Sequence, residues 1–322
     1  MKPSRVRPTF LFFAILATGT PWFAAHAAKI YLDPATGKYP PGVVFGVDVR
    51  LNTDRTQCVN AAEVDISYPK DQLQAVAASN GNSIFSVWVK QPTIYKEYGV
   101  ISFIGGLPGG YCGRVSGDPS LSNKLATLYF KFATSTPTST LPQAAQLTFL
   151  SGTQAVLNDG LGTVASLTYA GASYALLQKG QYVPVNTWEN AIVSDTAPPE
   201  PFTIGIYQDP SLFNNQWFAV FSTTDKQTGV DHYEVAEVSP TDLTESQSQW
   251  NWVRAVSPYL LKDQTRTDII AVRAIDAAGN ARVATYVPPK PVPATTGVQT
   301  WQFFAMIGIV GFVIMQIILR LL

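Results

Sequence analysis

The feature that most constrains this chain is an apolar run near its last residue. Residues 303–319 form a stretch of 17 residues without a charge, with Trp301 before it and Arg320 after it. A helix needs roughly 20 such residues to cross about 30 Å of hydrocarbon. A buried core helix is the alternative, but it normally keeps a polar face, and this run offers little beside Gln316. The pattern predicts a transmembrane helix over residues 301–320.

The N-terminal segment has the pattern of a secretory signal peptide. Three basic residues precede an apolar run, and small residues lead to an Ala-x-Ala cleavage pattern at 25–27. A first transmembrane helix is the alternative, although Gly19 and Pro21 interrupt the apolar run early. We expect residues 1–27 to be removed. The remaining chain is then held at its C-terminal end as a single-pass protein of the cell membrane, with its domains extracellular.

Composition excludes some classes of partner. The chain has 22 basic residues, Lys plus Arg, and 22 acidic residues, Asp plus Glu. It therefore lacks the net positive charge that attracts nucleic acid phosphates. Charged residues make up 14% of the chain, whereas Gly and Pro stand at 23 each, a balance typical of strand-and-turn proteins. Nucleic acid is therefore not an expected partner, and we expect an all-β chain before the anchor.

Cysteine use fits an oxidising compartment, because the only two cysteines are Cys58 and Cys112. A disulfide between them would close a loop of about 55 residues and contribute roughly 4 kcal/mol in the chain-entropy model. Two separate buried thiols are the alternative, since the sequence gives no Cα separation.

Period-2 alternation marks short strands through the first half of the chain. Within residues 43–51, for example, Phe45, Val47 and Val49 alternate with small or polar residues, which predicts one buried face. Eight or nine such runs occur in about 150 residues without intervening helices, a pattern typical of a β-sandwich, here placed at 28–180. The further runs lie at 29–33, 59–68, 83–90, 99–104, 125–132, 145–149 and 165–169.

Several segments resemble a known family in order and spacing. The runs GVVFGVDVRLNT, VNAAEVDISYPKDQLQ, WVKQP, GVISFIGG, KLATLYFKF and AVLNDGLGT make residues 29–177 similar to the cohesin domain, whose jelly-roll pattern is shared by the related cellulose-binding modules. The resemblance implies a binding module and not a catalyst. Cohesins hold dockerin modules of other proteins through a sheet face and its adjoining loops, and they tether polysaccharide-degrading enzymes to a scaffold or cell surface. No motif matches a cohesin contact motif residue for residue, so no contact residues are carried over.

Four aromatic residues are candidates for ligand contact, because exposed rings stack against sugar faces. They lie in or beside predicted loops: Trp88, Tyr95, Tyr98 and Tyr111. Trp88 sits inside an alternating strand, where core packing is the alternative. Tyr95 and Tyr98 are the better candidates, because residues 91–99 read as a charged loop.

The second half begins after a proline-rich boundary, TAPPEP at 196–201, within a predicted linker at 181–200. Six strand patterns follow in residues 201–288, as in a small antiparallel sandwich. The segments TTDKQTGVDHYEVAEV and IIAVRAIDAAGNARVATY resemble bacterial fibronectin type III or immunoglobulin-like repeats, which implies a spacer or adhesive module. A proline-rich stalk is predicted at 289–300.

The sequence gives little support for a metal site or a catalytic site. Asp225, Asp231 and Asp276 could join in a calcium site, but no spacing matches a known calcium loop, and we favour carboxylates that cap turns. His26 falls in the signal peptide, which leaves His232 alone, without a G-x-S-x-G elbow or a zinc-type cluster. We expect no enzyme activity, no metal and no cofactor.

Two function classes remain. The first is a cell-surface binding module that recognises an extracellular protein, such as a dockerin-like module, or a polysaccharide, with a link to polysaccharide catabolism. The alternative is a structural envelope or adhesion protein without a specific ligand. The glycines at 105 and 106 predict the start of a loop, GGLPGGYCGR at 105–114, and this loop and its neighbouring sheet face discriminate between them. Exposed apolar or aromatic groups in these two places favour a binding module, whereas charged groups that shield them from partners favour a passive spacer.

Overall fold

The computed structural model describes residues 28–53, 57–114, 123–133, 144–177, 185–240 and 246–289. The predicted signal peptide and the predicted transmembrane helix lie outside these residues, as does nearly all of the predicted stalk. Across the described ranges, no helix combines the length and the apolar character that a bilayer crossing needs. The described chain is built of strands with a single α-helix, α1 (Thr187–Ser194), which confirms the all-β class.

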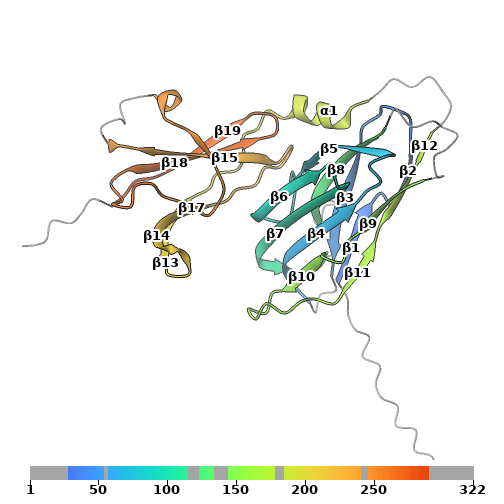
Figure 1. Ribbon diagram of the computed structural model, residues 1–322, viewed down its shortest axis with the longest axis horizontal. Helices are drawn as coiled ribbons and strands as arrows, with labels where there is room; N and C mark the ends of the chain where they lie inside the picture. Colours follow the sequence, from blue (N-terminus) through green and yellow to red (C-terminus); the bar gives the residue numbers. More distant parts are fainter. Residues whose placement is uncertain are drawn as a thin grey trace, which may run out of the picture. The chain divides into compact units, whose positions relative to one another are not determined.

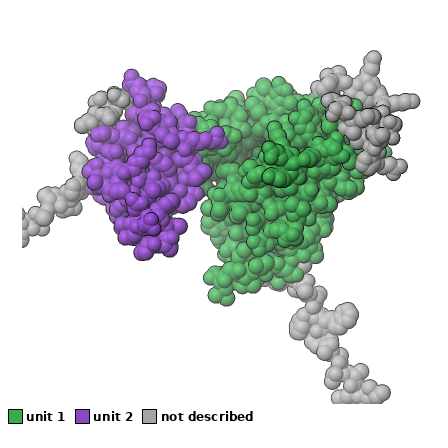
Figure 2. Space-filling view, in the orientation of Figure 1, with its two compact units in different colours: residues 1–202, 222–233, 274–282 green, residues 203–221, 234–273, 283–322 purple. Residues whose placement is uncertain are grey.

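The chain divides into two compact units (Figure 2). Unit 1 takes in two segments from the second half of the sequence, so the division differs from a simple cut at the predicted linker. Unit 1 comprises Met1–Phe202, Ser222–Tyr233 and Ala274–Arg282, and unit 2 comprises Thr203–Phe221, Glu234–Arg273 and Val283–Leu322.

Two sheets of unit 1 enclose one hydrophobic core (Figure 1). The five-stranded sheet has the order β11 (Leu167–Ala170), β1 (Ala28–Asp33), β3 (Phe45–Asn52), β8 (Lys124–Phe132) and β5 (Leu73–Ser79). The seven-stranded sheet has the order β2 (Thr36–Tyr39), β12 (Ala172–Leu176), β9 (Ala145–Phe149), β4 (Val59–Ser67), β7 (Val100–Tyr111) and β6 (Val87–Tyr95), with β10 (Gln154–Leu157) paired to β4.

The alternation read from the sequence produces this core. Phe45, Val47 and Val49 of β3 are buried, as the pattern predicts, and Phe45 pairs with Phe130 of β8. From the opposite sheet, Val64 of β4 reaches the same core. Side chains from the inner faces of both sheets thus meet in one layer, which is how a sandwich removes its apolar surface from water.

The predicted loop that begins at residue 105 is largely strand in the structure. Strand β7 continues to Tyr111, and Gly106 still pairs with Ala61 of β4. The sequence predicts a loop from these glycines, but Gly105 instead allows close packing within a strand. A Cβ there would lie 2.6 Å from the ring of Phe85. Glycine inside a strand marks a close approach of this kind as well as a turn.

The predicted linker contains helix α1, whose N-cap Asn186 accepts a hydrogen bond from the Glu189 N–H (3.1 Å). Trp188 of this helix contacts the ring of Tyr129 on β8, with ring centroids 4.8 Å apart. Helix α1, within the predicted linker, is therefore packed on the β-sandwich of unit 1.

The second half of the sequence forms two smaller sheets. One has the order β13 (Ile204–Asp209), β14 (Leu212–Phe221) and β17 (Tyr259–Leu260), and the other has the order β16 (Val253–Ala255), β15 (Val230–Val238), β18 (Ile269–Asp276) and β19 (Ala281–Tyr286).

Candidate functional site

The outward side of strands β4, β7 and β6 forms the first candidate site, here named the β4–β7–β6 face. Antiparallel pairing places side chains of the three strands in rows, because residues opposite one another point to the same side. The rows, from β4 to β6, are Ala61, Gly106 and Val87; Glu63, Ile104 and Lys90; Asp65, Ser102 and Thr93; and Ser67, Val100 and Tyr95.

A lysine organises the middle of this face. Lys90 Nζ donates a hydrogen bond to Ser102 Oγ (2.8 Å) and lies 5.1 Å from the centroid of the Tyr95 ring. Its ammonium group thus joins two rows and rests against an aromatic ring, a favourable cation–π placement. On the β4 side, Glu63 accepts a hydrogen bond from Gln154 Nε2 (3.0 Å). The face therefore combines acidic groups along β4 with aliphatic and aromatic groups along β6.

Strand β6 is the last strand of its sheet, but it is poorly shaped for pairing with another strand. Its register with β7 shifts between Trp88 and Lys90 and again between Lys90 and Thr93. Pro92 lies within this strand and has no backbone N–H to donate to a neighbouring strand. Bulges and proline are the features by which edge strands avoid adding a further strand. The outward side of the sheet, and not its edge, is therefore the surface suited to a partner.

The four aromatic candidates fall into two groups. Tyr95 is 38% exposed at the end of β6, and Tyr98 is 76% exposed in the turn that follows. Trp88 and Tyr111, in contrast, are each 9% exposed and belong to the hydrophobic core. Trp88 packs edge-to-face on Phe85 at 5.8 Å between centroids. The proposed ligand contacts at Trp88 and Tyr111 are therefore corrected, because both rings are used in packing.

The structure joins Cys58 and Cys112 by a disulfide with a Cα separation of 4.1 Å. Cys58 directly precedes β4 and Cys112 directly follows β7, so the bond holds one end of the strand pair that carries the β4–β7–β6 face. The Cys58 carbonyl also accepts a hydrogen bond from the Asn158 N–H (2.8 Å), which ties the segment after β10 to the same end.

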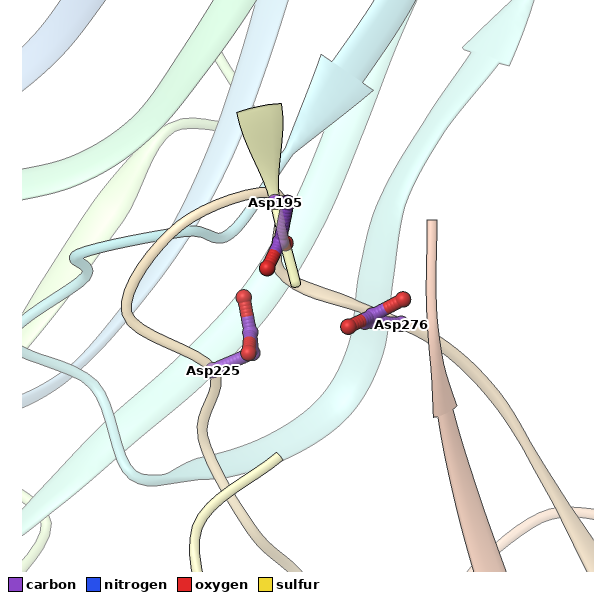
Figure 3. Close-up of side chains that lie close together, drawn as sticks. All are labelled: Asp195, Asp225 and Asp276. Atoms are coloured by element: carbon purple, nitrogen blue, oxygen red, sulfur yellow. The ribbon is translucent and has the colours of Figure 1, made fainter. Parts of the chain in front are cut away.

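The second candidate site is a cluster of three buried carboxylates in unit 1 (Figure 3). Asp195 is the C-cap of α1, Asp225 lies in the segment after β14, and Asp276 ends β18. One oxygen from each lies within 4.8 Å of the others. Asp231, which the sequence reading placed in such a group, is exposed, and its carboxylate contacts His232 Nδ1 at 2.6 Å. The cluster thus contains Asp195 in place of Asp231.

In Asp195 and Asp276, both carboxylate oxygens accept hydrogen bonds. Asp195 accepts from the Ala197 N–H at Oδ1 (3.1 Å) and from the Thr228 hydroxyl at Oδ2 (2.6 Å). Asp276 accepts from the Asn280 N–H at Oδ1 (2.8 Å) and from Asn280 Nδ2 at Oδ2 (2.9 Å). The turn-capping role expected for the aspartates is therefore present, and it links three segments that are distant in sequence.

Asp225 differs from its two neighbours. Its Oδ1 accepts from the N–H groups of Gln227 (2.9 Å) and Gly229 (2.8 Å). Burial raises the pKa of the Asp225 carboxyl, and the negative charges of Asp195 and Asp276 raise it further, although the two N–H groups oppose this change. Carboxylate and backbone oxygens are the ligands that hard divalent cations prefer, so this cluster is the part of the described chain best suited to hold a metal.

No protein-family model matches the chain, and no curated protein matches it in sequence. Solved structures that are similar to it include cohesin domains, each aligned to about half of the chain. A non-cellulosomal cohesin from the archaeon Archaeoglobus fulgidus is 18% identical, with 47% of this chain and 92% of that chain covered and a TM-score of 0.35.

Two further cohesins come from Acetivibrio cellulolyticus and Clostridium thermocellum. The sixth cohesin of scaffoldin B from Acetivibrio cellulolyticus, solved with a dockerin, is 16% identical over 47% of this chain and 99% of that chain, with a TM-score of 0.37. A cohesin–dockerin complex from Clostridium thermocellum gives 9% identity, coverage of 47% and 94%, and a TM-score of 0.38. With TM-scores below 0.5, these likenesses say nothing about what this chain binds.

Proposed function

We propose that the β-sandwich of unit 1 is a non-catalytic protein-binding module of the cohesin type, and that it binds its partner through the β4–β7–β6 face. The observation that carries the proposal is the chemistry of that face. Aliphatic and aromatic side chains of β6 and β7 share one side of the sheet with acidic side chains of β4, and Lys90 of β6 donates a hydrogen bond to Ser102 of β7. Exposed apolar and aromatic groups bordered by polar groups are a feature of protein interaction sites.

The exposure of the β6 residues supports the proposal. Val89 and Tyr98 are mostly exposed, and Val87 and Tyr95 are partly exposed, along one strand and the turn after it. The sequence criterion concerned residues 105–114 and the sheet face beside them. Within 105–114 the aromatic residue, Tyr111, is buried, and the exposed apolar and aromatic groups lie on the neighbouring strand β6 and the turn after it. A passive spacer has no use for such a surface, because exposed apolar groups carry a risk of aggregation.

The partner class follows from the sequence resemblance to cohesins. We propose an extracellular protein that carries a dockerin-like module, with the sandwich displayed outside the cell on the predicted helix at 301–320 and the fibronectin-like second half as a spacer. A link to polysaccharide catabolism belongs to the same proposal. Polysaccharide itself is a second candidate ligand, favoured by one observation: Tyr98 and Tyr95 are exposed tyrosines three residues apart.

The test is a binding screen with the immobilised full-length protein. Dockerin modules, extracellular proteins of the source organism and a glycan array serve as probes. We expect saturable binding of a protein probe that is weakened at least tenfold by Thr93→Arg, which adds a long charged side chain in the middle of the face. Thr168→Arg, at an exposed position on β11, is the matched control and leaves binding unchanged.

The pattern of loss separates the two ligand classes. A protein partner depends on Thr93 and Lys90 as well as on the tyrosines, because it covers several rows of the face. A sugar depends on Tyr95 and Tyr98 alone. Binding that survives Thr93→Arg without change contradicts the assignment of the face, and absence of binding to every probe supports the structural alternative.

A further inference from the structure

We propose that Asp195, Asp225 and Asp276 form a calcium-binding site within unit 1. This site is separate from the β4–β7–β6 face, and its three ligands come from the end of a helix, a loop and the end of a strand (Figure 3). The inference does not depend on what the sandwich binds.

The spacing of the oxygens fits one calcium ion. Calcium lies about 2.3–2.6 Å from its oxygen ligands, so two ligands on opposite sides are roughly 4.6–5.2 Å apart. One carboxylate oxygen from each aspartate lies within 4.8 Å of the other two. A single ion can therefore contact all three carboxylates where they stand, and Figure 3 shows the three side chains turned toward one another.

One carboxylate oxygen in this cluster takes part in no hydrogen bond with the described residues. Asp225 is 3% exposed, and both of its side-chain hydrogen bonds fall on Oδ1. No described residue donates to Asp225 Oδ2. A buried carboxylate needs a partner at its free lone pairs, either a donor or a metal ion. A cation among the three aspartates supplies that partner for Oδ2.

The charges around the cluster support a cation for a second reason. The basic side chains of the neighbouring segments are engaged elsewhere: Lys226 pairs with Glu200 (2.7 Å), and Arg282 donates to the Pro199 carbonyl. Asp195 is itself the C-cap of α1, which has no basic residue in its last turn. The negative end of the helix dipole therefore adds to three buried negative charges.

The ligand chemistry selects the class of ion. All three donors are carboxylate oxygens, so the group lacks the sulfur and nitrogen ligands that zinc prefers. Magnesium usually keeps several waters and takes only one or two carboxylates, whereas calcium is held by several protein oxygens at once. A bound calcium ion would fix the end of α1 to the 222–233 and 274–282 segments, all of which belong to unit 1.

The test uses protein made from the full 322-residue sequence, stripped of metal with a chelator and titrated with calcium chloride. We expect one calcium ion to bind per chain in isothermal titration, and we expect the unfolding temperature to rise by about 5 °C or more at saturating calcium relative to the chelator. Asp225→Asn removes the charge and the free carboxylate oxygen but keeps an Oδ1 acceptor for Gln227 and Gly229. Asp231→Asn, an exposed aspartate outside the cluster, is the matched control.

The proposal predicts that Asp225→Asn changes the unfolding temperature differently in chelator and in calcium. In chelator, Asp225→Asn unfolds at the same temperature as the unmodified protein or higher, because one of three like charges is gone, and in calcium it loses the stabilisation. The control behaves like the unmodified protein in both conditions. A role in turn capping alone is indicated if calcium neither binds to nor stabilises the unmodified protein, and that result overturns the proposal. Equal binding of magnesium at equal concentration overturns the assignment to calcium.

Discussion

The two ends of strand β6 use aromatic residues in opposite ways. At the start, Trp88 lies in the core, edge-to-face with Phe85 at 5.8 Å and with Phe103 at 6.0 Å between centroids. At the end, Tyr95 is part of the outward face and carries the ammonium group of Lys90 against its ring. The residue type is similar, and strand register decides the role. An aromatic residue in this strand is a packing residue or a contact residue according to the side of the sheet that it occupies.

The largest effect in this comparison is expected from Trp88→Ala. Truncation of a buried tryptophan removes its transfer free energy and leaves a cavity between Phe85 and Phe103, so the free energy of unfolding should fall by about 3–5 kcal/mol. Urea unfolding measures the change. Trp88→Phe, which keeps a ring in the site, should lose less. A loss below about 1 kcal/mol for the alanine variant would show that Trp88 is not a core residue.

Removal of the disulfide sharpens the same contrast, because the bond joins β4 and β7 at one end of the strand pair. The double variant Cys58→Ala and Cys112→Ala frees a loop spanning a sequence separation of 54, which predicts a loss of roughly 4 kcal/mol. Guanidinium unfolding with and without a reductant is the measurement. The unmodified protein in reductant should match the double variant, and equal stability of the oxidised and reduced forms would contradict the assignment.

A smaller effect is expected at Gly105. A Cβ there would lie 2.6 Å from Phe85 and 3.1 Å from Trp88, so Gly105→Ala must displace a ring and should cost about 1–3 kcal/mol. Gly46→Ala on β3 is the matched control, because its Cβ would be 3.4 Å from Thr127, an ordinary contact. If both variants unfold at the same urea concentration, the packing described for the start of β6 is wrong.

The smallest effect on stability is expected from Tyr98→Ala. The side chain is 76% exposed, and exposed substitutions usually change the free energy of unfolding by no more than about 0.5 kcal/mol. The same substitution should weaken partner binding. It should therefore change the affinity for the partner while leaving the free energy of unfolding nearly unchanged. A loss above about 1.5 kcal/mol in thermal unfolding would mean that Tyr98 has a packing role like that of Trp88.

Sequence reasoning located the strands whose apolar residues alternate clearly, such as the run through Phe45 and Val47. It missed β5, whose sequence LQAVAAS is rich in alanine, and it missed the short strands β2, β10 and β12. These strands are defined by pairing with neighbours, and their own composition favours no structure strongly. It also read Gly105 as a turn signal, because close packing against Phe85 depends on the tertiary structure.

The candidate sites were predictable to different degrees. Tyr95 and Tyr98 were preferred because residues 91–99 were predicted to be a charged loop. Both side chains are exposed, but the loop prediction is wrong for 91–95, which belong to β6. The burial of Tyr111 depends on the continuation of β7, which the glycines gave no reason to expect. Asp225 and Asp276 were considered for a cation. Asp195 was not, because it lies 33 residues from its nearest hydrogen-bonding partner across the cluster, Thr228, and nothing local distinguishes it from other aspartates.

The most direct test of the account is hydrogen–deuterium exchange of the full-length protein with and without a protein partner retained in the binding screen. We predict slower exchange of the backbone amides of β6, the turn at 96–99 and β7 in the complex, because the partner covers the β4–β7–β6 face. Strands β11 and β1 of the opposite sheet should exchange at unchanged rates. Protection confined to β11 and β1, with β6 unaffected, would contradict the assignment of the β4–β7–β6 face as the binding surface.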